Sequence, residues 1–254
     1  MEVKPKKYLG QHFLLDKTVS QRIADAINIK PTLNLLEIGP GTGALTEFID
    51  DENIHLVAYE LDQESILYLN KKFPNLKVFN QDILNVNWTK IFETNFSVTG
   101  NFPYNISSQI MFKIFEYRNN IDQMVGMFQK EVAERICSSH GTKKYGILSV
   151  LIQTFYNVEY LFTVDENAFN PPPKVKSGVI KIQRNNIDQL SCDEKLFYKV
   201  VKAIFNQRRK MVRNSLKSIV GDLKIDHYLF TKRPEELSVN NFIEITQILE
   251  SKIK

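Results

Sequence analysis

The feature that most constrains the fold is an alternation of strand-like and helical patterns between residues 33 and 183. Short apolar runs predict strands at residues 33–38, 55–60, 76–79, 96–100, 123–128, 158–164 and 177–183. Helical periodicity between these runs predicts helices at residues 44–49, 63–72, 107–117, 130–137 and 147–155. Strands that alternate with helices form a largely parallel sheet with helices on both faces, so we predict an α/β fold.

The length of the chain limits the number of domains. At 254 residues it can hold one α/β domain and a small second domain. A polar stretch at residues 184–189 predicts a linker, so we place an α/β domain at residues 1–185 and a small helical domain at residues 190–254. A hydrophobic content of 43% is ordinary for a globular protein, and no apolar run reaches the roughly 18 residues of a membrane span.

Two features of the sequence bear on the compartment. Residues 1–7 are charged and no apolar segment follows them, so we predict no secretory signal. The two cysteines, Cys137 and Cys192, lie in different predicted elements. We therefore expect reduced thiols in a cytoplasmic protein, with neither a disulfide framework nor a metal site.

The net charge of +4 is too small to identify a partner, but cations gather in one region. Residues 195–221 contain no acidic residue and hold Lys195, Lys199, Lys202, Arg208, Arg209, Lys210, Arg213 and Lys217. An interleaved apolar stripe that includes Leu196 and Val200 predicts that this run lies on an amphipathic helix. Runs of this kind are commonly solvated helix faces, but a dense cationic face also suits nucleic-acid phosphates. The candidate RNA-binding residues are Arg208, Arg209, Lys210 and Arg213.

A glycine-rich loop follows the first predicted strand, where Glu37 precedes Gly39, Gly41 and Gly43. Glycines allow a tight turn and let the backbone approach a ligand closely. Glu60 ends the second strand, where a carboxylate can accept hydrogen bonds from ribose hydroxyls. The loop and Glu60 also satisfy a loosened dinucleotide fingerprint, so by themselves they leave the cofactor open.

Polar residues also end the third and fourth strand segments. Asp82 is placed to meet an adenine amino group of a cofactor that lies across the strand ends, and Asn101 follows the fourth strand. With Glu37 and Glu60, these residues form an arrangement typical of methyltransferases. Asp82 has an alternative interpretation as the cap of the next turn, and Glu37 as an ordinary polar residue at a strand end.

The tetrapeptide Asn101-Phe102-Pro103-Tyr104 suits the binding of a flat base with an exocyclic amino group. Pro103 stiffens the backbone and keeps the preceding residue extended. The Asn101 side-chain oxygen and the carbonyl of Phe102 or Pro103 can accept the two amino hydrogens. Tyr104 is then expected to stack on the base. The alternative interpretation is an ordinary turn, with Tyr104 packed on the following helix.

Several segments, in order along nearly the whole chain, resemble the ribosomal RNA adenine N6,N6-dimethyltransferases. The segments are residues 8–16, the loop 37–43 with Glu60 and Asp82, residues 101–104, the F-x-P-x-P-x-V-x-S loop at 169–177, and residues 205–216. The resemblance implies a Rossmann-like S-adenosylmethionine-dependent methyltransferase sheet with a small C-terminal helical domain. The implied cofactor-binding residues are Gln11, His12, Leu14, Glu37, Gly39, Gly41, Gly43, Glu60, Asp82 and Asn101. The implied catalytic residues are Asn101, Pro103, Tyr104 and Phe169, of which Phe169 would close the second face of the base.

Within the family, the sequence resembles the branch that modifies small-subunit rRNA. The branch that modifies large-subunit rRNA in macrolide resistance shares residues 101–104 and the proline loop, whereas residues 205–216 and 233–238 favour the small-subunit branch. This resemblance implies an enzyme that modifies two adjacent adenines in a stem-loop near the 3′ end of 16S rRNA on an assembling 30S particle. We expect a monomer, although the sequence does not determine the oligomeric state. His12 and Phe102 depart from the commoner Asn and from the commoner Leu or Ile.

Two other functions are compatible with parts of the sequence. A nicotinamide-dependent oxidoreductase would use the glycine loop and Glu60, but it leaves residues 101–104 and the basic run unexplained. A non-catalytic ribosome-assembly factor, or a mitochondrial-type transcription cofactor, could use the same fold to bind RNA. The intact residues 101–104 argue against a loss of activity, and the absence of an Arg-rich transit segment argues against a mitochondrial address.

Overall fold

The computed structural model describes residues 3–28, 33–221 and 225–253. The chain folds into two compact units. Unit 1 comprises Met1–Ala133 and Val158–Arg184, and unit 2 comprises Glu134–Asn157 and Asn185–Lys254. This division differs from the predicted domains in residues 134–157, which group with the C-terminal residues. The chain leaves unit 1 after its fifth long strand and returns to it later, which a reading along the sequence does not reveal.

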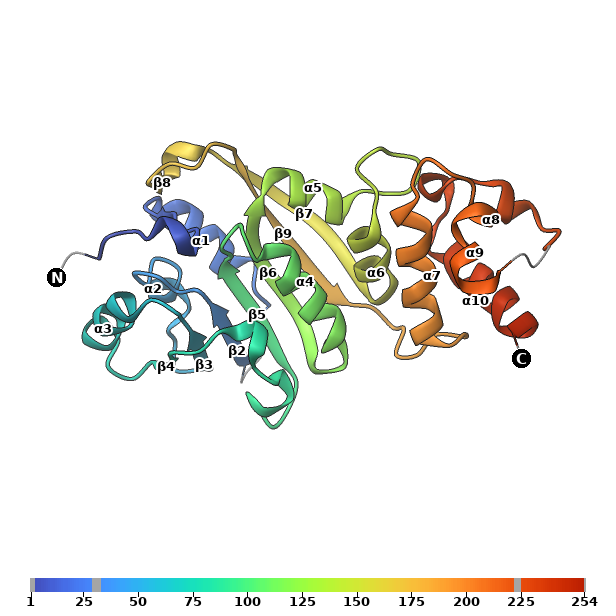
Figure 1. The fold of residues 1–254 in the computed structure, drawn as a ribbon. Coiled ribbons are helices and arrows are strands. Elements are labelled where there is room, and N and C mark those ends of the chain that lie inside the picture. The colour runs from blue at the N-terminus through green and yellow to red at the C-terminus, as the bar shows by residue number, and fades with distance from the viewer. Residues whose placement is uncertain (1–2, 29–32, 222–224, 254) are drawn as a thin grey trace. The chain divides into compact units, whose positions relative to one another are not determined.

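In the described residues, unit 1 contains a seven-stranded sheet with the order β4-β3-β2-β5-β6-β9-β7 (Figure 1). Its strands are β2 (Leu33–Ile38), β3 (Ile54–Tyr59), β4 (Lys77–Phe79), β5 (Phe96–Asn101), β6 (Ile121–Gln129), β7 (Tyr156–Val164) and β9 (Ser177–Arg184). The pairs from β4 to β6 are parallel, and β9 is antiparallel to β6. The predicted, largely parallel α/β sheet is therefore confirmed.

The central strands are apolar because helices cover the sheet. Leu35 and Leu36 point to opposite faces of β2 and both are fully buried. On one face, Leu35 belongs to a core cluster with Ile23 and Leu69. These two residues come from α1 (Lys17–Asp25) and α3 (Gln63–Lys72), and α2 (Thr46–Ile49) contributes Ile49. The strand order reverses between β2 and β5, and a crevice at such a switch point is where open α/β sheets bind ligands.

The structure contains short elements that periodicity did not predict. A two-residue strand, β1 (Phe13–Leu14), pairs antiparallel with β8 (Phe169–Asn170). By contrast, α4 (Ser107–Glu116) and α5 (Lys130–Cys137), which follow β5 and β6, correspond to the helices predicted at residues 107–117 and 130–137. The 3-10 helices are η1 (Lys7–Leu9), η2 (Ile83–Asn85), η3 (Trp88–Lys90), η4 (Arg118–Asn120), η5 (Glu166–Ala168), η6 (Tyr228–Thr231) and η7 (Pro234–Glu236).

Unit 2 is helical. Its helices are α6 (Ile147–Phe155), α7 (Glu194–Asn206), α8 (Val212–Ser215), α9 (Lys217–Val220) and α10 (Val239–Ile253). Phe197 and Ile204 on α7 and Phe242 on α10 are fully buried, and the rings of Phe205 and Phe242 stack at 5.5 Å. Among the residues described, no helix combines the length and apolar character needed to span a membrane.

The prediction that the basic run lies on one helix is wrong. Helix α7 ends at Asn206, so Arg208, Arg209 and Lys210 lie in the turn before α8, and Arg213 lies on α8. The physical reason is that residues 207–210 are all polar. They offer no apolar side chain at helical spacing to hold a further turn of α7 against the core.

Candidate functional site

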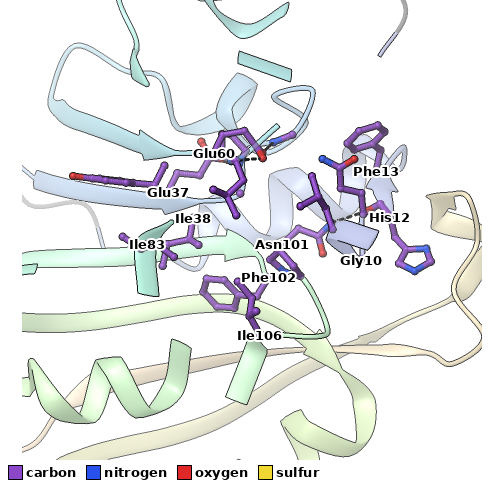
Figure 2. A pocket seen from close by; sticks show the side chains of 18 of the residues that line it. Gly10, His12, Phe13, Glu37, Ile38, Glu60, Ile83, Asn101, Phe102 and Ile106 are labelled. Atoms are coloured by element: carbon purple, nitrogen blue, oxygen red, sulfur yellow. Dashed lines mark hydrogen bonds between the residues drawn. The ribbon is translucent and has the colours of Figure 1, made fainter. Parts of the chain in front are cut away.

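A pocket opens at the carboxyl ends of β2, β3 and β5 in unit 1 (Figure 2). Its volume is about 1090 Å³, including space open to solvent, which is at the upper end for small-molecule sites. The lining residues are Leu9–Leu14, Glu37–Thr42, Ala44, Leu45, Tyr59–Leu61, Gln81–Ile83 and Asn101–Ile106. The pocket therefore has room for a nucleoside cofactor and part of a second ligand.

The glycine loop forms one wall of the pocket. Gly39 and Gly41 have φ values of 67° and 56°, in the left-handed region that favours glycine. A Cβ on Gly41 would lie 3.1 Å from the Phe13 ring, so a side chain there would meet the N-terminal residues. The missing side chain leaves room for a ligand to approach the loop backbone.

Glu37 is the most deeply buried acid in the pocket, with 1% of its surface exposed. Its Oε2 accepts a hydrogen bond from the Thr46 hydroxyl at 2.7 Å. Burial raises the pKa of Glu37 to about 8, and the nearby Glu60 carboxylate contributes in the same direction. Without a ligand, Glu37 is therefore mostly protonated at neutral pH and can donate as well as accept a hydrogen bond.

Glu60 follows β3 and its carboxylate is held by backbone N–H groups. Gly41 N donates to Oε2 at 3.0 Å, and Leu61 N and Asp62 N donate to Oε1 at 2.8 and 2.9 Å. Burial raises the pKa of Glu60 despite these hydrogen bonds. The N–H groups fix the carboxylate orientation. Oε2 accepts only one of the three hydrogen bonds and keeps a lone pair with which it can accept a ligand hydroxyl.

Asp82 combines the two interpretations that the sequence allowed. It caps η2, because its carboxylate accepts hydrogen bonds from Leu84 N at 2.9 Å and from Asn85 Nδ2 at 3.0 Å. It also lines the pocket, beside Ile83. A capping role and a ligand contact are compatible, because a carboxylate offers about four lone-pair sites.

Asn101 is the last residue of β5 and reaches the N-terminal residues. Its Nδ2 donates to the backbone oxygen of His12 at 3.0 Å, as the dashed line in Figure 2 marks. This contact uses the donor end of the amide. It leaves the Oδ1 end of Asn101 as an acceptor in the pocket.

Tyr104 lies beside Asn101 and is fixed on two sides. Its hydroxyl is 2.5 Å from Ser177 Oγ, and its ring stacks on the His12 ring with centroids 5.4 Å apart. The His12 ring is also fixed, with Nδ1 2.7 Å from the carbonyl oxygen of Pro171. Burial raises the pKa of Tyr104, so the phenol stays neutral.

The predicted cofactor-binding and catalytic residues are brought together in this pocket with two exceptions. Gly43 is not among the lining residues, and a Cβ there would lie 2.5 Å from the Phe73 ring. Gly43 is therefore needed for packing against the end of α3. Phe169 has 3% of its surface exposed and belongs to the apolar core cluster, because its strand β8 turns it inward from the pocket wall.

The structure adds lining residues that the sequence did not single out, among them Tyr59, Leu61, Ile83 and Asn105. Most are apolar and follow strands, so they carry no signal that separates a ligand wall from a core. For Tyr59, Leu61 and Ile83, a usable signal was that they adjoin the predicted acids Glu60 and Asp82 in the sequence.

A second hollow lies in unit 2 and is strongly basic. It is lined by Arg209, Lys210, Met211, Arg213, Asn214, Lys217 and Arg233. The fourth predicted RNA-binding residue, Arg208, is not in this lining. Its guanidinium donates to the Thr142 carbonyl at 3.2 Å and lies 3.9 Å from the Glu235 carboxylate. Arg208 therefore connects segments within unit 2.

The pocket in unit 1 fits an adenosyl cofactor. Buried carboxylates at Glu37 and Glu60 suit hydroxyl and amino groups, and Ile38 and Ile83 supply apolar contacts for a flat ring. Among the described residues, no group of His, Cys, Asp and Glu side chains is arranged to hold a metal ion.

Comparison with known proteins identifies the family. The family model "Ribosomal RNA adenine dimethylase" matches residues 2–251. The chain is 53% identical to the ribosomal RNA small subunit methyltransferase A of Parabacteroides distasonis, over 99% of this chain and 96% of that protein. It is 52% identical to the protein of the same name from Flavobacterium johnsoniae, over 98% and 97%.

Two solved structures share the fold at 24% identity. They are a dimethyladenosine transferase from Plasmodium falciparum, with a TM-score of 0.80 over 95% of this chain and 98% of that one, and the 23S rRNA methyltransferase ErmE, with a TM-score of 0.70 over 92% and 99%. The family match covers nearly all of the sequence, and the chain belongs to the ribosomal RNA adenine dimethylase family.

Proposed function

We propose that this protein methylates N6 of two adjacent adenines in a stem-loop near the 3′ end of 16S rRNA, on an assembling 30S particle. The chain is an S-adenosylmethionine-dependent rRNA (adenine-N6,N6)-dimethyltransferase. This activity decides against the nicotinamide-dependent alternative. The names of the relatives that are 52–53% identical support the small subunit as the target. We further propose that the enzyme is a cytoplasmic monomer.

The cofactor is S-adenosylmethionine, which supplies a methyl group bound to a positively charged sulfur. We propose that the pocket-lining residues Gln11, His12, Leu14, Glu37, Gly39, Gly41, Glu60, Asp82 and Asn101 hold it. Glu60 would accept the ribose hydroxyls, because backbone N–H groups already orient its carboxylate. Gly43 would contribute through the shape of the loop, because it packs against Phe73.

The single observation that carries the mechanism is the orientation of Asn101. An adenine amino group is a poor nucleophile because its lone pair is delocalised into the ring. Asn101 Nδ2 is bound to the His12 carbonyl, so Oδ1 is the end that can accept an amino hydrogen. Pro103 O already accepts a hydrogen bond from Ile106 N at 3.1 Å, so we propose Phe102 O as the second acceptor.

These acceptors are too weakly basic to remove the amino proton before transfer. Their role is to hold the amine in line and to stabilise the positive charge that develops on N6. Tyr104 would supply the stacking surface, and aromatic stacking contributes about 1–3 kcal/mol per base. Phe169 would support this region from the core, because its ring is buried there.

The target adenine must be unpaired or turned out of its helix, because N6 is inaccessible inside a duplex. We propose that Arg209, Lys210 and Arg213 in the basic hollow bind phosphates and supply affinity, while the pocket in unit 1 selects the base. Arg208, bound to Thr142 O, would support the turn that presents Arg209 and Lys210.

Mass spectrometry of small-subunit and large-subunit rRNA from cells that lack this protein tests the proposed target. We expect dimethyladenosine to disappear from the small-subunit RNA. The wild-type protein should restore it, and the Asn101→Ala variant, produced at the same level, should not. Loss of the modification from large-subunit RNA instead would overturn the proposed substrate, and restoration by Asn101→Ala would overturn the mechanism.

A further inference from the structure

Residues 6–14, here called the N-terminal strap, include a continuous side of the cofactor pocket. Leu9–Leu14 all line it, and Figure 2 shows His12 and Phe13 at one end of the pocket and Ile83 at the other. Asn101 Nδ2 binds the strap through His12 O. The strap therefore bounds the space for the cofactor and contacts the side chain proposed to orient the target amine.

The C-terminal end of the strap is anchored by apolar burial. Leu14 has 4% of its surface exposed and belongs to the main core cluster with its β8 partner Phe169. The adjoining Leu15 N donates to Ala168 O at 2.8 Å. Opening this end would expose core side chains, so it is suited to be a hinge.

The N-terminal end of the strap contains no buried apolar residue of its own, although Val3, three residues before it, has only 8% of its surface exposed. None of the η1 residues Lys7–Leu9 is buried, and Tyr8 is 77% exposed. The end is held by polar contacts to Asp62, whose carboxylate accepts hydrogen bonds from Lys6 Nζ and, at 3.2 Å, from Gln11 Nε2. Lys6 N in turn donates to Gln11 Oε1 at 2.7 Å.

Asp62 is a rigid acceptor for these contacts. It is 2% exposed, and it caps α3 by accepting hydrogen bonds from Glu64 N at 3.1 Å and Ser65 Oγ at 2.9 Å. Its own N–H binds Glu60 Oε1. The residue that secures the strap is thus adjacent to the carboxylate proposed to bind the ribose.

We propose that Lys6 and Asp62 are positioning residues that hold the N-terminal strap closed over the pocket and thereby set the rate at which cofactor leaves. Each target base receives two methyl groups, so product cofactor must leave and fresh cofactor must enter between transfers. Opening at the Asp62 end would release one wall of the pocket, while Leu14 stays in the core. The same opening would separate His12 O from Asn101 and so couple cofactor release to the target site.

The variants Lys6→Met and Asp62→Asn test this proposal. Asn keeps the side-chain shape and can still cap α3, but it removes the charge that Lys6 contacts. Lys6→Arg keeps the charge and is the rescuing variant. Lys17→Met is the matched control, because it removes an ion pair with Glu47, at 2.6 Å, that does not involve the strap.

Two measurements apply to the full chain. One is the dissociation rate of S-adenosylhomocysteine in a competition experiment, and the other is hydrogen exchange of the amides of residues 9–12 in cofactor-free protein. We expect both rates to rise about tenfold in Lys6→Met and Asp62→Asn, equivalent to about 1.4 kcal/mol. The double variant should add little to Lys6→Met, because that change already removes the contact with Asp62, together with an ion pair from Lys6 Nζ to the exposed Glu64 carboxylate at 3.3 Å. The KM for the cofactor should rise while kcat does not fall in parallel.

Lys6→Arg and Lys17→Met should remain near wild type in both measurements. The proposal is overturned if dissociation and strap exchange are unchanged in Lys6→Met, which alters a partly exposed side chain and leaves the α3 cap intact. It is also overturned if Lys17→Met accelerates both rates equally, or if the two changes add fully in the double variant.

Discussion

The pocket of unit 1 and the basic hollow of unit 2 use titratable side chains in different ways. In the pocket, Glu37 and Glu60 are more than nine-tenths buried, and each accepts specific hydrogen bonds. In the hollow, Arg209, Lys210 and Arg213 lie at the surface, and no described carboxylate forms an ion pair with them. Buried, oriented groups can place one atom of a ligand, whereas exposed cations attract phosphates without fixing a single geometry.

The strongest test of this contrast is Asn101→Ala. We expect single-turnover methyl transfer, at saturating RNA and cofactor, to slow by about 100-fold or more, because an oriented transition-state contact is lost. RNA affinity should change far less, because the phosphate contacts remain. Quench-flow measurement of labelled methyl transfer checks this, and a rate within about twofold of wild type would contradict the role assigned to the amide.

The burial of Glu37 predicts a pH effect on stability. Because burial raises the pKa of Glu37 to about 8 from a usual value of 4.5, the native state holds a proton that the unfolded state loses. Stability should therefore fall as pH rises between these values, by about 2 kcal/mol from pH 6 to 7.5.

Urea unfolding of the cofactor-free protein measures this dependence. The Glu37→Gln variant should lose this fall in stability with rising pH, and the exposed control variant Glu47→Gln should keep it. In Glu47, hydrogen bonds from Lys17 and Lys72 lower the pKa, which gives the opposite sign. Equal pH slopes for wild type and Glu37→Gln would show that Glu37 does not hold the extra proton.

Charge reversal in the hollow should weaken RNA binding and leave the rate of methyl transfer at saturating RNA unchanged. Arg209→Glu with Arg213→Glu is expected to weaken RNA binding by about tenfold and to reduce the salt slope by about two, because two phosphate contacts are lost. Filter binding over a range of salt concentrations measures both. Lys195→Glu with Lys199→Glu makes the same change in net charge on α7, outside the hollow. If the Arg209 and Arg213 variant kept the wild-type salt slope, or if the Lys195 and Lys199 variant lost as much RNA affinity, the hollow would not be the phosphate-binding site.

The smallest expected effect separates the ring of Tyr104 from its hydroxyl. Tyr104→Phe keeps the stacking surface and removes the contact with Ser177 Oγ, so we expect a change in the RNA KM of about fivefold or less. Tyr104→Ala removes the stacking surface and should raise the RNA KM further than Tyr104→Phe does. Steady-state kinetics on a stem-loop RNA compare the two. Equal losses in both variants would assign the role to the hydroxyl.

The sequence predicted the sheet well because its strands are continuous apolar runs that end in glycine or polar residues. Strand β2 and helix α3 have the predicted bounds, and β5 ends at Asn101. The N-terminal segment was harder to place. The β1–β8 pair depends on contacts between residues more than 150 positions apart, such as Leu14 with Phe169, and periodicity carries no signal for it.

For the site, sequence reasoning located some residues in the pocket and misplaced others. Residue type and position at strand ends located Glu37, Glu60, Asp82 and Asn101, all of which line the pocket. The glycine pattern placed Gly43 at the ligand, and the family resemblance placed Phe169 there. Their environments are the packing around Phe73 and the apolar core, respectively. Likewise, charge alone could not separate Arg208, which binds Thr142 O, from the cations of the hollow.

The most direct test is a crystal structure of the enzyme with sinefungin, a stable cofactor analogue, and a stem-loop from the 3′ end of 16S rRNA. We predict one adenine turned out over the end of β5, with its N6 at about 2.7–3.2 Å from Asn101 Oδ1 and its ring on Tyr104. An adenine whose N6 is bound elsewhere, or an analogue that lies outside the pocket, would contradict the account.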